Sequence, residues 1–202
     1  MGVAATGKTT LSREIARRVS AVYLDNNYIA DAFFPRTRNG PEYDRLRPKL
    51  YRALYTIAEE NLKLGNTVLL DVPHVKDVQK KQWRTFITRL ARKTGAKMIV
   101  VRCLCSERTL YRRIRSRGEP RDRWKTDHWK EFLKNEPIDI RIPFKHLDIN
   151  TENALSKNLR DALSYILKES SITGRNVARL RRNKKKKMFT KTQSTQSSEI
   201  WF

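Results

Sequence analysis

Short runs of apolar residues alternate along most of the chain with longer stretches in which apolar positions recur every three or four residues. The short runs predict strands, and the spacing of three and four predicts helices with one buried face. The expected strands are Ala21–Leu24, Thr67–Asp71, Lys97–Leu104 and His146–Ile149. The expected helices are Lys8–Val19, Glu42–Leu64, Val75–Thr94, Glu107–Arg117, Asp127–Asn135 and Glu152–Leu167. This alternation favours an α/β fold, a parallel sheet with helices on both faces.

The charge of the chain is strongly unbalanced. Its 202 residues include 44 Lys or Arg against 21 Asp or Glu, a formal net charge of +23, which favours anionic partners such as phosphates or nucleic acid. Residues 173–202 hold nine of the Lys or Arg, one acidic residue and few apolar residues. We therefore expect one domain over residues 1–171 and a basic, disordered tail over 172–202. The tail is a candidate for nucleic-acid contacts, although a solubilising extension has the same composition.

Two further observations bear on the setting of the protein. No apolar run approaches the length needed to cross a bilayer, and the first residues lack the pattern of a secretory leader. Cys103 and Cys105 lie together in an apolar run, without further Cys or suitably spaced His to complete a metal site. We expect a cytoplasmic protein with reduced cysteines and no membrane partner.

The first residues carry the motif that decides the class. Residues 2–9 fit G-x-x-x-x-G-K-[ST], the phosphate-binding loop of nucleotide-binding proteins. Its two glycines let the backbone wrap around phosphates, and the helix that follows adds its positive end. Lys8 is expected to reach the β- and γ-phosphates of ATP, and the Thr9 hydroxyl to hold Mg²⁺. The expected ATP-binding residues here are Gly2, Val3, Ala4, Ala5, Thr6, Gly7, Lys8, Thr9 and Thr10.

A phosphate loop normally follows the carboxyl end of a central buried strand, yet only Met1 precedes Gly2. The first strand of the fold is therefore apparently missing. We expect either that the true start lies upstream or that the sheet has a gap at its centre. A gap would leave two strand edges unpaired within a core, which is costly.

A second group of charged residues lies in Arg112–Lys125. Arg113 and Arg117 are four residues apart and share a helix face, and Arg121 follows on a loop after the helix-breaking Gly118 and Pro120. Guanidinium groups on a helix end and a loop suit a lid that clamps a transferring phosphoryl group. A solvated basic helix followed by an ordinary loop is the alternative.

Together these segments resemble the P-loop kinases of the nucleoside-monophosphate-kinase class, and more narrowly the polynucleotide-kinase-like and zeta-toxin-like branch. The resemblance rests on Gly2–Thr9, on Tyr23–Asn27, on Val68–Asp71 and on the arginines of Arg112–Lys125. It implies a five-stranded parallel sheet, ATP and Mg²⁺ as cofactors, and a lid that closes on the nucleotide. It also implies that Asp25 handles the proton of the acceptor hydroxyl and that Asp71, with Thr9, holds Mg²⁺.

The same resemblance gives the lid arginines their roles. Lys8, Arg117 and Arg121 would stabilise the negative charge of the transferring phosphoryl group, Asp25 would act in catalysis through the acceptor proton, and Arg113 would bind the nucleotide. Asp25 and Asp71 also read as ordinary turn residues at strand ends, which is the alternative for each. The resembled kinases often carry Asp-x-Asp, whereas Asn27 stands at the second position here, and Tyr28 stands where polynucleotide kinases have an arginine.

Three functions follow as hypotheses. The first is an ATP-dependent kinase that phosphorylates a hydroxyl of a small-molecule or nucleoside-like acceptor. The second keeps the fold but makes the acceptor the 5′-hydroxyl of RNA or DNA. The third is a nucleotide-binding protein without catalysis.

Overall fold

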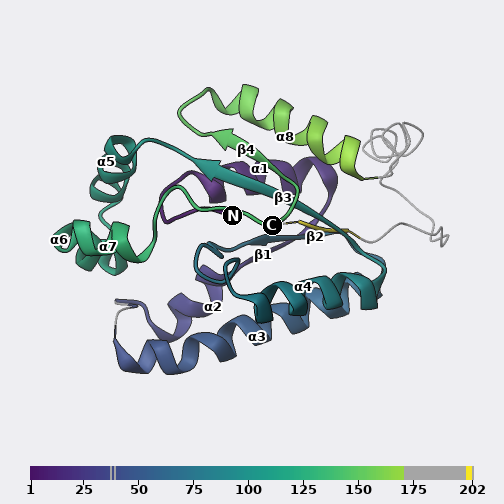
Figure 1. Cartoon of the computed structure of the whole chain (residues 1–202), viewed down its shortest axis with the longest axis horizontal. Helices are drawn as coiled ribbons and strands as arrows, with labels where there is room; N and C mark the ends of the chain where they lie inside the picture. The colour runs from purple at the N-terminus through teal and green to yellow at the C-terminus, as the bar shows by residue number, and fades with distance from the viewer. Residues whose placement is uncertain (37, 39, 171–198, 202) are drawn as a thin grey trace, which may run out of the picture.

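The computed structural model describes residues 1–36, 38, 40–170 and 199–201. In this part of the chain a parallel sheet has the strand order β1-β2-β5-β3-β4 (Figure 1). The strands are β1 (Val22–Asp25), β2 (Val68–Asp71), β3 (Lys97–Leu104), β4 (His146–Asn150) and β5 (Glu199–Trp201). The longer helices are α1 (Lys8–Val19), α2 (Asn26–Phe33), α3 (Pro41–Lys63), α4 (Lys81–Thr94), α5 (Glu107–Arg117) and α8 (Leu155–Glu169). The short ones are η1 (Pro120–Asp122), α6 (Arg123–Asp127) and α7 (Trp129–Asn135).

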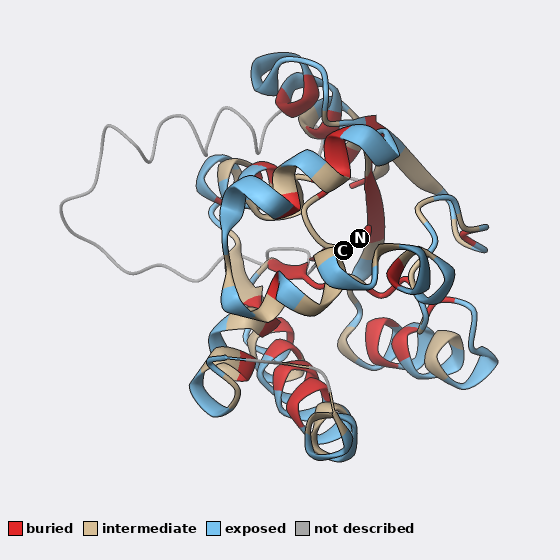
Figure 2. Ribbon diagram, turned by 90° about the vertical axis from the view of Figure 1, so that its left-hand side faces the viewer, coloured by how far each residue is buried: buried red, intermediate tan, exposed pale blue. Residues whose placement is uncertain are grey.

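Helices cover both faces of the sheet, as the alternation predicts. Helices α1 and α8 pack together on one face, and α3 and α4 pack on the other (Figure 1). Successive strand residues enter opposite cores because side chains alternate along a strand. In β2, Leu69 packs with α1 and α8, whereas Val68 and Leu70 pack with α3 and α4. The buried faces of the helices therefore line both sides of the sheet (Figure 2).

Several expected elements begin and end where the pattern predicts. The helix Lys8–Val19 and the strand Lys97–Leu104 have the predicted limits. The expected helix Val75–Thr94 begins only at Lys81, because residues 75–79 form turns in which the N–H of Val78 bonds back to the His74 carbonyl. The expected helix Asp127–Asn135 is replaced by α6 and α7, which meet at His128.

Helix α2 was not expected, because its sequence opens with Asn26 and Asn27, which are turn residues by propensity. The carboxylate of Asp25 begins the helix by accepting the backbone N–H of Asn27 at 2.8 Å. Such a capping bond stabilises a helix by about 1 kcal/mol. One side chain therefore converts an apparent loop into a helix directly beside the carboxyl end of β1.

Two expectations about the ends of the chain need correction. The sheet has no gap at its centre, because β5 lies between β2 and β3 and pairs with both in parallel. Residues 199–201 are therefore part of the domain rather than of a disordered tail, since Ile200 and Trp201 are buried there. The rest of the predicted tail, 172–198 and 202, lies outside the described residues. The boundary near residue 171 stays a prediction.

No helix within the described ranges combines the length and the apolar character that a membrane-spanning helix needs.

Candidate functional site

The backbone of the phosphate loop, residues 2–9, is tightly constrained at its first glycine. Gly2 has φ +140°, and a Cβ atom there would lie 2.5 Å from the carbonyl oxygen of Cys103. The Gly2 N–H donates to the Pro73 carbonyl at 3.1 Å, and the Thr6 hydroxyl donates to the Val3 carbonyl at 2.8 Å. The loop is thus fixed between the carboxyl ends of β2 and β3, where parallel sheets bind ligands.

Helix α1 begins directly after the loop. Its N-cap is Gly7, in the left-handed conformation with φ 84°. Because the first N–H groups of a helix have no partner within it, they are available to an anion, and the helix dipole favours negative charge there. Thr9 lies half-buried in the first turn and Thr10 is exposed beside it. The predicted phosphate-binding residues therefore come together in one loop and one helix end.

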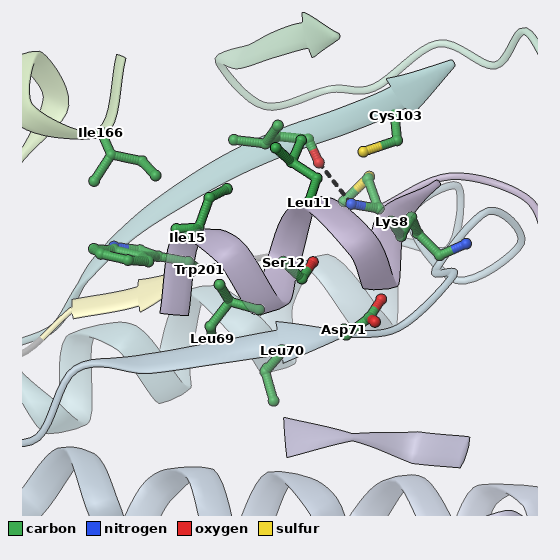
Figure 3. A pocket seen from close by; sticks show the side chains of 12 residues that line it. Lys8, Leu11, Ser12, Ile15, Leu69, Leu70, Asp71, Cys103, Ile166 and Trp201 are labelled. Atoms are coloured by element: carbon green, nitrogen blue, oxygen red, sulfur yellow. Dashed lines mark hydrogen bonds between the residues drawn. The ribbon is translucent and has the colours of Figure 1, made fainter. Parts of the chain in front are cut away.

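The ammonium group of Lys8 lies inside this loop. Its Nζ donates to the Val3 carbonyl at 2.7 Å. Burial lowers the pKa of Lys8, and the nearby negative charge of Asp71 acts in the opposite direction. Figure 3 shows Lys8 and Asp71 at the same side of a small cavity, contributed by α1 and by the end of β2. The lysine is held close to where the phosphates of a bound nucleotide belong.

Two buried carboxylates lie at neighbouring strand ends. Asp25 ends β1 and Asp71 ends β2, and the two residues are paired in the register of the parallel strands. The Tyr23 hydroxyl lies between them, 2.7 Å from an oxygen of Asp71 and 3.3 Å from an oxygen of Asp25. Burial raises the pKa of Asp25, and the charge of Asp71 raises it further. A raised pKa suits a group that must accept a proton.

The residues predicted to hold Mg²⁺ fit the preferences of that ion. No group of three or more His, Cys, Asp or Glu is placed to hold a metal within the described ranges. Mg²⁺ does not require one, since it commonly binds one or two carboxylates together with phosphate oxygens and water. The Thr9 hydroxyl and the Asp71 carboxylate are oxygen ligands on the two elements that flank the loop. This donor set matches a magnesium nucleotide rather than a protein-only metal site.

The lid arginines are paired with acids in this structure. Arg121 forms an ion pair with Asp31 of α2, and Arg117 forms one with Asp122. Burial is the main cause of the lowered pKa of Lys8, and the positive charge of Arg117 adds to it. Both arginines are thus bound to carboxylates in this structure, and their contact with a phosphoryl group stays a prediction.

Arg113 is joined to the loop through one residue. Its guanidinium donates to the hydroxyl and to the carbonyl of Thr151, each at 2.9 Å. The side chain of Thr151 lies beside Gly7, where an added Cβ atom would approach it to 3.2 Å. Arg113 is thus linked to the phosphate loop through Thr151, and its role in nucleotide binding stays a prediction.

Sequence reasoning missed three acidic residues around the site. Asp31 pairs with both Arg38 and Arg121, Asp122 pairs with Arg117, and the charge of Glu136 acts on the pKa of Lys8. Asp122 is almost fully buried, which is rare for an acid without a partner. The acidic residues within the arginine-rich segment were a usable signal for such pairing. The partnership of Asp31 with Arg121 had none, because 90 positions separate them.

The fold and this arrangement agree with comparisons to known proteins. A family model described as an AAA domain matches residues 1–136, about two thirds of the chain. The chain belongs to this family. The matched part of the AAA domain contains the phosphate loop, both strand-end acids and the arginine-rich segment. No curated protein matches the sequence.

Solved structures show the same fold as this AAA domain. A sugar kinase from Janibacter sp. HTCC2649 superimposes with a TM-score of 0.61 at 14% identity, over 82% of this chain and 91% of that one. The APS kinase CysC from Mycobacterium tuberculosis, in complex with AMPPNP and APS, gives a TM-score of 0.58 at 14% identity, over 82% and 94%. These matches show that the chain has the α/β fold of these two kinases. The narrower branch stays a prediction.

Proposed function

We propose that this protein is an ATP-dependent kinase that transfers the γ-phosphoryl group to a hydroxyl of a small-molecule or nucleoside-like acceptor. One observation carries the proposal. The phosphate loop with Lys8 opens at the same edge of the sheet as the two buried carboxylates Asp25 and Asp71. A phosphate cradle supports nucleotide binding, and a carboxylate of raised pKa beside it supports transfer to a hydroxyl.

The nucleotide would be held by the loop amides, the first turn of α1 and Lys8. Thr9 and Asp71 would hold Mg²⁺, which when bound neutralises charge on the β- and γ-phosphates. Arg113 would bind the nucleotide beside Gly7. These groups are positioned before substrate arrives, so their electrostatic stabilisation needs little reorganisation during the reaction.

The acceptor would lie beside Asp25. A bond forms between the acceptor oxygen and the γ-phosphorus, the bond from that phosphorus to the leaving ADP oxygen breaks, and Asp25 takes the hydroxyl proton. One Asp25 oxygen already accepts the N–H of Asn27, so the oxygen nearer Tyr23 is the one available. Arg117 and Arg121 would stabilise charge on the transferring group once their present ion pairs are exchanged for phosphate.

The test is a screen for transfer of labelled γ-phosphate to sugars, nucleosides and other hydroxyl-bearing metabolites. Wild-type protein should label one acceptor class, and Lys8→Ala and Asp25→Asn should lower the rate at least 100-fold. Lys157→Ala, a change at an exposed position on α8, is the matched control and should leave the rate unchanged. Heat of Mg·ATP binding without transfer to any acceptor would instead support a non-catalytic nucleotide-binding protein.

A second candidate acceptor is the 5′-hydroxyl of RNA or DNA, and one feature favours it. A groove of about 420 Å³ runs between α4 and residues 143–144. Its lining contains Lys81, Arg84, Thr85, Thr88, Arg89, Arg92, Pro143 and Phe144, with no acid among the described residues. Cations around an aromatic ring are typical of grooves that bind single strands.

This candidate is tested with 5′-hydroxyl oligonucleotides in the same screen. Affinity should fall steeply with salt, and the double variant Arg89→Glu/Arg92→Glu should weaken binding at least tenfold. The control Lys157→Glu/Arg160→Glu makes the same charge change on α8, on the opposite face of the sheet. Equal loss in both double variants would indicate only the overall charge of the protein.

A further inference from the structure

Both ends of the described chain occupy one slot of the sheet. Strand β5 lies between β2 and β3 (Figure 1). Ile200 is opposite Val68 of β2 and Met98 of β3. Further along the same slot, the amino group of Met1 donates to the Val101 carbonyl at 2.6 Å, and the N–H of Cys103 donates to the Met1 carbonyl at 2.9 Å. Met1 therefore continues the line of β5 along β3.

The register along β3 gives the spacing between the two segments. Trp201 lies opposite Ile99, and the bonds of Met1 place it opposite Arg102. Since paired parallel strands advance together, one residue for one residue, two positions separate Trp201 from Met1. A cavity of about 20 Å³ has both Trp201 and Met1 in its lining. That volume holds about one water molecule.

The side chains give independent support for the same spacing. Ile200 packs in the core beneath α3 and α4, Trp201 in the core beneath α1 and α8, and Met1 again in the first core. In an unbroken strand, faces alternate from one residue to the next. With two positions between Trp201 and Met1, the alternation is preserved across the break. The hydrogen bonds to β3 and the packing therefore describe one interrupted strand.

We propose that Glu199–Trp201 and Met1–Gly2 act as a single strand, so that the C-terminal segment of the chain positions the phosphate loop. Gly2 follows Met1 directly, and its N–H is bonded to Pro73 at the end of β2. A shift of the strand along the slot would move the loop with it. That the two segments form one strand does not depend on the proposed kinase activity. The expected effect on nucleotide binding does depend on that proposed function.

The first measurement is hydrogen exchange in the full-length wild-type protein. The Ile200 amide lies inside the sheet and should exchange at least 100-fold more slowly than in an unfolded peptide. Exchange at the unprotected rate would overturn the proposal, whatever the protein does with nucleotides.

The second measurement uses a circular permutant that retains all residues. It begins at Met188, runs through Phe202, continues through one inserted valine into Met1, and ends at Lys187. With Phe202 and the valine, it supplies the two positions that the register requires, and its new ends lie outside the described residues. It should melt several degrees above the parent protein. A permutant that fails to fold or melts below the parent would contradict the proposed continuity.

The third measurement separates positioning from stability. Ile200→Ala should weaken Mg·ATP binding about tenfold well below the melting temperature. Ile87→Ala removes an equally buried side chain from the same core, but on α4, and should lower the melting temperature without changing that affinity. When Ile200→Ala is made in the circular permutant, most of the lost Mg·ATP affinity should be restored. Equal affinities for the two variants would refute a positioning role, and no Mg·ATP binding by wild-type protein would refute the proposed function alone.

Discussion

Replacing Gly2 with alanine tests the geometry of the phosphate loop at its tightest point. The added Cβ would lie 2.5 Å from the Cys103 carbonyl oxygen and 2.9 Å from the Thr6 hydroxyl, at φ +140°. The carbonyl belongs to the backbone of β3, so the loop rather than the sheet has to move. Reaching an ordinary contact of 3.4 Å requires a displacement of about 0.9 Å.

That displacement sets the expected magnitude. A misplacement of about 1 Å in a binding constellation costs about 100-fold, so Gly2→Ala should weaken Mg·ATP binding by about that factor. The strained φ costs about 1–3 kcal/mol and the collision a similar amount, so unfolding free energy should fall by about 2–6 kcal/mol. The assays are titration calorimetry with Mg·ATP and unfolding in guanidinium chloride.

Gly65→Ala is the matched control. Gly65 also has a positive φ, +82°, but an added Cβ meets no described atom within 4 Å. This variant should lose about 1–2 kcal/mol of stability from backbone strain alone and keep its nucleotide affinity. A Gly2→Ala variant that has the same free energy of unfolding as Gly65→Ala and binds Mg·ATP as tightly as the wild-type protein would refute the steric conflict at Gly2.

Three further predictions concern the surroundings of the loop. Tyr23→Phe removes a hydrogen bond that lowers the pKa of Asp25, so the acidic limb of the plot of kcat/KM against pH should move to higher pH. Because that bond is 3.3 Å long, the shift should be about one pH unit or less. Asp31→Asn releases Arg121 from an ion pair at a partly exposed carboxylate, worth about 1 kcal/mol at most, and should tighten Mg·ATP binding up to about fivefold in titration calorimetry; weaker binding would show that the pair holds the lid in its binding position. Burial lowers the pKa of His74 to about 4, so between about pH 6.5 and 4 the unfolded chain binds a proton that the folded chain does not bind. The free energy of unfolding should therefore fall in this range as the pH is lowered, by up to about 1.4 kcal/mol per pH unit. His74→Phe should remove this contribution of His74 to the pH dependence.

Much of the sheet was predictable because its strands are short apolar runs bounded by polar residues. Lys97–Leu104 and Lys8–Val19 have the predicted limits, since one is built around the apolar run Met98–Val101 and the other has a clear buried face. Helix α2 was not predictable from propensity, because one hydrogen bond from Asp25 to Asn27 decides it. Local patterns identify elements well when burial determines them and poorly when a single polar contact does.

The site divides in the same way. Lys8, Asp25 and Asp71 can be predicted as candidate site residues from the sequence, because Lys8 belongs to a loop motif and the two aspartates follow apolar runs that predict strands. The partnership of Arg121 with Asp31 depends on how the lid folds onto α2, which no local spacing encodes. Strand β5 was missed for a related reason, because three residues at the end of a polar, basic stretch carry too little pattern to predict a strand.

The position of β5 has a consequence for biosynthesis. Every other strand of the sheet leaves the ribosome before it, and yet β5 pairs with two of them at the centre. Until residues 199–201 emerge, β2 and β3 present facing edges with unmatched amide and carbonyl groups, which is a state prone to aggregation. The nascent protein would therefore depend on chaperones until β5 has emerged and paired with both edges.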